Sequence, residues 1–308
     1  MTNSTFSYQL AKFIDFQDLE ACERVRKIKK SEIATTQNPN LKINVIERKE
    51  DFYNAFAKDL IDRIVQAKEE DRKFVAIVPV GPVPQYAIAA ALINQRKINL
   101  DHVHFFNMDE YADQDGNTAP ITWEGSFQKA MYENFIYKID EELRPKDSQL
   151  NFPTSKAIGS YTSMIEDLGG ADVCYGGIGW CGHIAFWESS LGHEFLGDHE
   201  SFKKAGPRTV ELSPMTIMQN ALHSFGGDWS WVPPKANTIG PVNILGARAR
   251  SFWLDGDLGG GVSWQRFIAR LVLHGPVSEF VPGSFLQTQP SEINILGGVA
   301  DDIVINMA

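Results

Sequence analysis

Residues 173–188 read VCYGGIGWCGHIAFWE, a short apolar segment that leads into a turn with four glycines between residues 176 and 182. A short apolar run of this kind is typical of a strand that is covered on both faces of a parallel sheet. The glycines allow the backbone of the turn to approach a neighbouring group closely. Two earlier segments have the same apolar character, FVAIVP at residues 74–79 and VHFFN at residues 103–107.

Helical periodicity between these segments completes an alternation of strands and helices. This order predicts a doubly wound, mostly parallel α/β sheet with helices on both faces, which is a Rossmann-like fold. We expect further strands at residues 42–47, 242–245, 251–254, 292–296 and 303–306. We expect helices at residues 84–95, 122–136, 160–168 and 262–273, and another helix that begins with an N-cap at Asp51.

Residues 1–40 lie outside this alternation, and we expect them to form an N-terminal helical extension to an α/β domain at residues 41–308. Within the extension, residues 18–30 predict a basic helix and residues 35–40 predict a linker. The helix either packs on the surface as a solvated element or binds a partner.

Composition excludes several classes of protein. The 308 residues include 29 Lys and Arg against 39 Asp and Glu, a formal net charge of −10, which argues against a nucleic-acid partner. An apolar content of 43% excludes a long disordered protein, and three cysteines without zinc spacing predict neither a disulfide scaffold nor a metal site. Because we find no signal-peptide pattern and no apolar stretch of membrane-spanning length, we expect a cytoplasmic protein with no membrane partner.

Polar groups follow two of the predicted strands. In an open parallel sheet, ligands bind beyond the carboxyl ends of the strands. Asp109 and Glu110 follow the strand at residues 103–107 and can supply a general base, although an aspartate there can also cap a helix or form a turn. His183 and Glu188 follow the glycine turn, and a histidine beside a carboxylate is a usual acid–base pair. A structural histidine and a solvated glutamate are the alternatives.

The segments FNMDEY at residues 106–111 and GGIGWCGHIAFWE at residues 176–188 resemble the glucosamine-6-phosphate deaminase/isomerase family, which is related in fold to the 6-phosphogluconolactonases. The final residues, IAFWE, favour the deaminase branch, and the resemblance covers the chain apart from the N-terminal extension. It implies that Asp109 moves a proton between C2 and C1 of an open-chain sugar. It also implies that His183 handles the proton of the ring oxygen, while Glu188 orients His183. The resemblance implies no metal or organic cofactor, and it implies a homo-oligomer.

One departure from the family lies beside the candidate acid–base pair. Cys181 stands where the family has an aspartate, two residues before His183. A neutral thiol is a weaker partner for a protonated histidine than a carboxylate, although a neighbouring imidazolium favours the thiolate. The alternative is a small buried residue without a chemical role. We therefore place Cys181 beside Asp109, His183 and Glu188 among the candidate catalytic residues.

A second departure concerns phosphate binding. The family's phosphate-binding turn reads Val80-Gly-Pro-Val-Pro84 here, and it lacks both the hydroxyls and two of the backbone N–H groups. The family's phosphate-binding arginine and lysine fall near Asn220 and Gln265, which carry no charge. The arginines that could compensate are Arg208, Arg266 and Arg270. Because buried phosphate needs cations or donors, we expect an altered pocket that takes an unphosphorylated or differently decorated sugar.

Two further features have both a functional and a structural interpretation. Residues 255–261, DGDLGGG, form either a flexible surface loop or a loop whose aspartates bind sugar hydroxyls or a cation. Trp180 and Trp187 flank the histidine turn, and they either stack on a sugar face or belong to the core.

Together these observations predict a sugar isomerase or deaminase-like enzyme whose small-molecule substrate is a hexosamine, a hexose or a phosphate of either. A lactonase-like hydrolase, and a non-catalytic sugar-binding or regulatory protein on the same fold, are the alternatives. The residues expected to bind the sugar are Gly81, Pro82, Val83, Glu110, Gly179, Gly182 and Arg266.

Overall fold

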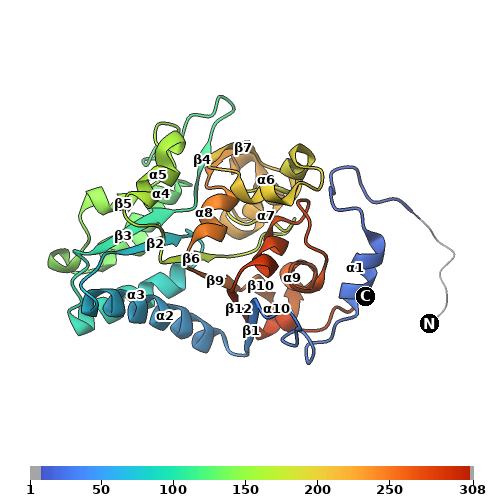
Figure 1. Cartoon of the computed structure of the whole chain (residues 1–308), viewed down its shortest axis with the longest axis horizontal. Helices are drawn as coiled ribbons and strands as arrows, with labels where there is room; N and C mark the ends of the chain where they lie inside the picture. The colour runs from blue at the N-terminus through green and yellow to red at the C-terminus, as the bar shows by residue number, and fades with distance from the viewer. Residues whose placement is uncertain (1–7, 306–308) are drawn as a thin grey trace.

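The computed structural model describes residues 8–305. Its centre is a seven-stranded sheet in the order β1-β12-β9-β6-β2-β3-β5, and each neighbouring pair of strands is parallel (Figure 1). The strands, in chain order, are β1 (Leu41–Ile46), β2 (Phe74–Val78), β3 (Val103–Asn107), β5 (Leu150–Asn151), β6 (Val173–Gly176), β9 (Ala249–Leu254) and β12 (Ser291–Leu296). The sheet confirms the predicted doubly wound, parallel architecture.

Helices cover both faces of this sheet. Figure 1 shows α2 (Lys49–Glu69) and α3 (Val83–Arg96) along its lower side, with α5 (Tyr161–Glu166) and α8 (Pro241–Gly246) above it. The remaining α-helices are α1 (Leu19–Arg26), α4 (Phe127–Asn134), α6 (His199–Lys204), α7 (Pro214–Ser224), α9 (Gln265–His274) and α10 (Gly297–Ala300). The short 3-10 helices are η1 (Ile136–Lys138), η2 (Glu141–Leu143), η3 (Asp147–Gln149), η4 (Ile158–Ser160), η5 (Ser189–Glu194), η6 (Trp229–Trp231) and η7 (Pro282–Thr288).

Two smaller sheets lie beside the central one. An antiparallel sheet joins β4 (Asp109–Ala112), β8 (Lys235–Thr238) and β7 (Arg208–Glu211). Its strand β4 continues the chain from β3 after a single residue, Met108, so Asp109 lies where the parallel and antiparallel sheets meet. The hairpin of β10 (Asp257–Gly259) and β11 (Val262–Ser263) follows β9.

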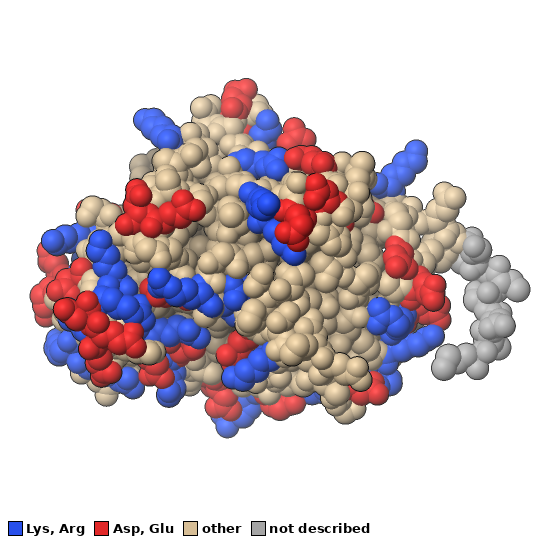
Figure 2. Space-filling model, in the orientation of Figure 1, with Lys and Arg blue, Asp and Glu red and all other residues tan. Residues whose placement is uncertain are grey.

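The core forms because the apolar strands are covered on both faces. All five residues of β2 are buried, and they belong to one large cluster with the inward faces of α2 and α3. No helix within residues 8–305 is long and apolar enough to cross a membrane. Figure 2 shows positive and negative side chains interspersed on the visible face, which is typical of a solvated surface.

Several predicted boundaries and two predicted strands are wrong. Residues 242–245 lie in helix α8, because Pro241 presets the first helical turn and Asn243 Oδ1 accepts the Gly240 N–H at 3.2 Å. Residues 303–305 form no strand, since β12 already pairs with β1 and β9, and residue 306 lies outside the described residues. Asp51 does not cap α2; the N-cap is Arg48, and Asp51 lies in the first turn, where its charge favours the helix dipole.

The boundaries of three predicted helices differ from the structure for local reasons. The helix expected from residue 262 begins at Gln265, because glycines with positive φ at residues 259–261 close the β10–β11 hairpin first. Helix α4 begins after an N-cap at Ser126, whose Oγ accepts the Lys129 N–H at 3.3 Å. The segment predicted as a helix at residues 160–168 contains α5 only up to Glu166.

The N-terminal segment contains the expected helix, α1, which begins after an N-cap at Asp18. Arg24 donates to the carbonyl of His274 at 2.9 Å, so α1 lies against the end of α9. The buried Arg270 of α9 donates to the carbonyls of Ile28, Ala300 and Asp301 at 2.8, 2.8 and 3.0 Å. The division of the chain at residue 40 remains a prediction.

Arg270→Met should lower the free energy of unfolding by about 3 kcal/mol, because three carbonyls lose the fully buried guanidinium that donates to them. Urea unfolding followed by tryptophan fluorescence measures the change. Arg48→Met, at a side chain that is 71% exposed, is the matched control and should change stability by less than about 0.5 kcal/mol. Equal effects of the two substitutions would contradict this role of Arg270.

Candidate active site

A cleft of about 480 Å³ lies at the carboxyl ends of four adjacent strands, β9, β6, β2 and β3. The chain beyond these strands supplies Asp255, the loop from Gly177 to His183, the turn from Val80 to Val83, and Asp109 respectively. From β2 the chain adds β3 on one side of the sheet, and it later adds β6 on the other side of β2. The direction in which strands are added therefore changes between β2 and β6, and ligands bind at such points in open α/β sheets.

Asp109 borders this cleft and is only 9% exposed. Burial raises the pKa of Asp109 to about 7, an effect that the neighbouring His183 opposes. A carboxyl with that pKa is present in both protonation states near neutral pH. It can therefore accept a proton and return it, as a general base and acid must do.

Glu110 points away from the cleft, because successive side chains of a strand alternate between its two faces. Its carboxylate accepts the N–H groups of Tyr111, Phe127 and Gln128 at 2.9, 3.0 and 2.8 Å. It also accepts the Ser126 hydroxyl at 2.9 Å. These contacts join β4 to the start of α4. Glu110, which was expected to bind the sugar, therefore holds two elements together and does not line the cleft.

The glycine turn determines where the imidazole of His183 lies. The Gly182 N–H donates to the Gly179 carbonyl at 2.9 Å, and Gly182 adopts a φ of +88°, which disfavours residues with a side chain. A Cβ on Gly179 would lie 1.9 Å from His183 Nε2. The imidazole therefore packs directly on the backbone of Gly179, with Nε2 beside that residue on the cleft wall.

The other ring nitrogen, His183 Nδ1, faces a buried group of polar side chains. It lies 3.0 Å from Thr216 Oγ1, 3.2 Å from Cys181 Sγ and 3.9 Å from Glu188 Oε2. The Cys181 thiol donates to Glu188 Oε2 at 3.2 Å, and the Ser213 N–H donates to Glu188 Oε1 at 3.3 Å. The structure thus brings Cys181 and Glu188 together beside His183, and it adds Thr216, which the sequence analysis did not name.

Burial favours the neutral form of this histidine–glutamate pair. Glu188 is fully buried, and burial raises its pKa to about 8, with Cys181 adding to the effect. Burial also lowers the pKa of His183, although Glu188 and Asp109 oppose the shift. A thiol at residue 181 fits this environment, because an aspartate there would place a second negative charge beside a buried carboxyl.

Cys181, His183 and Glu188 could together hold a metal ion. They are the one group of this kind within residues 8–305, and their ligand atoms lie within 4.8 Å of one another. These atom types bind zinc in other proteins. Here they contact each other, Thr216 and Ser213, so hydrogen bonds account for their positions. The expectation that the protein needs no metal stays a prediction.

The predicted sugar-binding residues separate into two groups. Gly81, Pro82, Val83 and Gly179 line the cleft. Gly182 does not, and its carbonyl accepts the Gly283 N–H at 2.7 Å.

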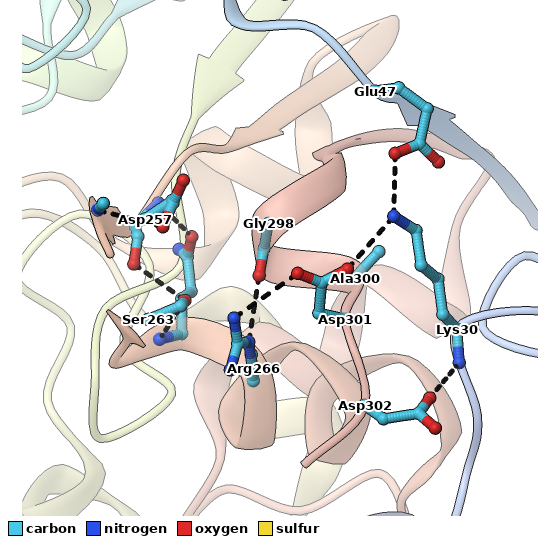
Figure 3. Close-up of polar contacts among 12 residues, drawn as sticks. Lys30, Glu47, Asp257, Ser263, Arg266, Gly298, Ala300, Asp301 and Asp302 are labelled. Atoms are coloured by element: carbon cyan, nitrogen blue, oxygen red, sulfur yellow. Dashed lines mark hydrogen bonds and ion pairs between the residues drawn. The ribbon is translucent and has the colours of Figure 1, made fainter. Parts of the chain in front are cut away.

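Arg266 lines a separate hollow together with Lys30 and Asp301. Figure 3 shows the polar contacts of these side chains. It donates to the Gly298 carbonyl at 2.9 Å and lies 3.5 Å from an Asp301 oxygen. Neither of the other two arginines reaches the cleft, since Arg208 pairs with Glu194 and Arg270 binds carbonyls.

The two tryptophans beside the histidine turn also differ. Trp187 is fully buried among Phe195 and Phe202, which agrees with the core interpretation. Trp180 is 37% exposed and lies against Trp264, which itself lines the cleft.

Two polar residues of the cleft wall, Gln85 and Gln265, were not among the predicted sugar-binding residues. Gln85 lies on the first turns of α3, and its Nε2 donates to Asp255 Oδ2 at 3.3 Å. Gln265 uses its amide to join two loops: Nε2 donates to the Ile178 carbonyl at 2.6 Å, and Oε1 accepts the Gly256 N–H at 2.8 Å. Asp255, which was assigned either to a surface loop or to a binding loop, is exposed within the cleft.

Asp109→Asn should change how stability depends on pH. Because the folded protein holds the Asp109 proton up to about pH 7, deprotonation costs wild-type stability as pH rises from about 4 to 7. The variant lacks that loss, so its stability relative to wild type should rise across this window by up to about 4 kcal/mol. Urea unfolding between pH 4 and 8 measures the difference. A flat profile for Asp109→Asn would contradict the raised pKa.

Comparison with known proteins places the chain among its relatives. No model of a protein family matches it. It is 32% identical to a glucosamine-6-phosphate deaminase of Caenorhabditis elegans over 211 residues, which cover 66% of this chain and 72% of that protein. It is 30% identical to glucosamine-6-phosphate deaminase 2 of Giardia intestinalis over 215 residues, or 68% of this chain and 72% of that one.

Solved structures share the fold at lower identity. A monomeric glucosamine-6-phosphate deaminase aligns with a TM-score of 0.70 at 23% identity, covering 84% of this chain and 98% of that one. A 6-phosphogluconolactonase from Thermotoga maritima aligns with a TM-score of 0.59 at 14% identity, and the alignment covers 83% of this chain and 99% of that one. These likenesses show the shared fold. On the sequence identity with the curated relatives, the chain belongs to the glucosamine-6-phosphate deaminase family, which is a family of enzymes.

Proposed function

We propose that this protein isomerises an open-chain hexosamine or hexose by moving a proton between C2 and C1, and that it releases ammonia when the substrate is an amino sugar. The observation that carries this proposal is the pairing of two acid–base groups on one cleft: Asp109, whose pKa is raised to about 7, and the uncharged imidazole of His183. The kinship with glucosamine-6-phosphate deaminases supports the same chemistry.

Ring opening comes first, because the C2 proton becomes acidic only when C1 is a carbonyl. His183 Nε2 lies on the cleft wall beside Gly179 and can accept the proton of the C1 hydroxyl. It then returns that proton to the ring oxygen as the ring C–O bond breaks. A neutral imidazole suits this role, since its two nitrogens accept and donate without leaving a buried charge.

Asp109 then acts on the open-chain sugar. Its carboxylate takes the C2 proton, which leaves an enolate with its negative charge on O1. The C2 hydroxyl or ammonium group gives a proton to O1, and the Asp109 carboxyl returns the C2 proton to C1. For an amino sugar the product is a ketose imine, which water hydrolyses to a ketose and ammonia. Because Asp109 is half protonated at about pH 7, it can perform both halves of the transfer without an external acid.

Glu188, Cys181 and Thr216 act as positioning residues in this mechanism. They contact Nδ1 of His183 from the buried side, which leaves Nε2 for the sugar. Fixing the ring in this way keeps its reactive nitrogen at one place on the wall, and such orientation strongly affects the rate of a positioned reaction.

The experiment follows hexoses and hexosamines, free and as 6-phosphates, by NMR in deuterated water with the purified protein. We expect ketose formation with deuterium at C1, a rate that rises with pH through about 7, and ammonia from amino sugars. Asp109→Asn should lower kcat by about 10³-fold, since it removes the base.

The matched control is Asp115→Asn, an exposed aspartate outside the cleft, which should retain the wild-type rate. A sugar acid formed from a lactone would indicate a lactonase. Sugar binding without deuterium incorporation would indicate a non-catalytic protein. Either result would contradict the proposal.

A further inference from the structure

The charge of the cleft is unusual for a site that would hold a phosphate ester. Among the described residues that line it there is no lysine or arginine, whereas its acidic residues are Asp109, Glu124 and Asp255. A phosphate monoester carries nearly two negative charges near neutral pH and binds through cations and charge-assisted hydrogen bonds. A cleft with three carboxyl groups and no such cation favours an uncharged or cationic ligand instead.

The turn after β2 also offers few donors. Pro82 and Pro84 have no backbone N–H, and the Val83 N–H donates to the Gly81 carbonyl at 2.8 Å. The start of a helix often binds anions through its free N–H groups. At the start of α3 two of these groups are missing and a third is already paired, so the helix terminus contributes little to anion binding.

Asp255 and Gln85 instead present acceptors at this part of the wall. Gln85 is fully buried, and its Oε1 has no hydrogen-bond partner among residues 8–305, although its Nε2 donates to Asp255 Oδ2. Buried amide oxygens are nearly always paired in folded proteins, so an unpaired one on a cleft wall points to a missing donor. A sugar hydroxyl is such a donor, whereas a phosphate dianion has no hydrogen to give.

One unpaired donor lies on the same cleft. Trp264 Nε1 is a buried atom without a hydrogen-bond partner in the described part of the chain. A polyol matches a wall of mixed donors and acceptors, because each hydroxyl both donates and accepts. Gln265 does not add to this set, since its amide is fully used by Ile178 and Gly256.

We propose that the cleft is built for an unphosphorylated sugar, whose free hydroxyls donate to the Asp255 carboxylate and to Gln85 Oε1 and accept from Trp264 Nε1. This inference deepens the proposed function by naming the substrate class of the same site. An amino sugar is especially favoured, because its protonated amine adds a positive charge to an acidic cleft. The 6-phosphate of the same sugar would bring its negative charge against the carboxyl groups of Glu124 and Asp255, which remain in the Asp109→Asn protein.

Titration calorimetry with the full chain tests the inference without requiring turnover. The probes are glucosamine, glucose and their 6-phosphates, and the protein carries Asp109→Asn so that no substrate is consumed. We expect free glucosamine to bind at least about 100-fold more tightly than its 6-phosphate. Tighter binding of the 6-phosphate, or no binding of either free sugar, would overturn the proposal.

Variants of the wall then identify the groups responsible. When Asp255→Asn is added to the Asp109→Asn protein, free glucosamine should bind about 10-fold more weakly. The preference of the protein for glucosamine over its 6-phosphate should become smaller. The matched control is Asp257→Asn, which lies two residues further along the chain and does not line the cleft. Asp257 Oδ1 accepts the Gly259 N–H at 3.1 Å. This control should leave both affinities unchanged. An Asp255→Asn variant with unchanged affinities would remove Asp255 from the proposal and overturn it.

The two proposals fail in different ways. If free glucosamine binds with the expected preference but the wild-type protein exchanges no C2 proton, the proposed isomerase function is wrong and the substrate class stands. If the wild-type protein isomerises only the 6-phosphate, the function stands and the inference is wrong.

Discussion

Exclusion of water from His183 and Glu188 is the constraint on which the rest of the site depends. Glu188 is fully buried and the imidazole is nearly so, with the ring pressed onto the backbone of Gly179. A charged pair is costly in such a place, so a neutral imidazole and a protonated carboxyl are favoured. Cys181 is compatible with this arrangement because its thiol contacts both groups without adding a charge.

The parallel sheet brings the reactive groups together. Strands β9, β6, β2 and β3 are neighbours, so the segments that follow them converge on one cleft even though they are far apart in the chain. Asp109 lies at the start of β4, where antiparallel pairing with Thr238 of β8 fixes its backbone. The result is a buried base on one segment and a buried imidazole on another, held by different sheets.

The sequence predicted the parts of the fold that depend on local pattern. β2, β3 and β6 were found because both their faces are buried, whereas helix α8 was mistaken for a strand because four apolar residues do not distinguish the two periods. Contacts between distant residues were beyond that reasoning: Thr216 reaches His183 across 33 residues, and Gln85 reaches Asp255 across 170. Arg266 was expected at the cleft, but neighbouring residues of a helix point about 100° apart, and Gln265 takes the cleft side instead.

The protonation of Asp109 is the property on which the account stands, and NMR measures it directly. With carbon-13 in the aspartate carboxyl groups, the resonance that disappears in Asp109→Asn is followed from pH 3 to pH 9. We expect a titration midpoint near pH 7, because burial of Asp109 disfavours the charged form. A midpoint near the ordinary aspartate value of about 4 would show that water reaches this carboxyl, and it would contradict the account.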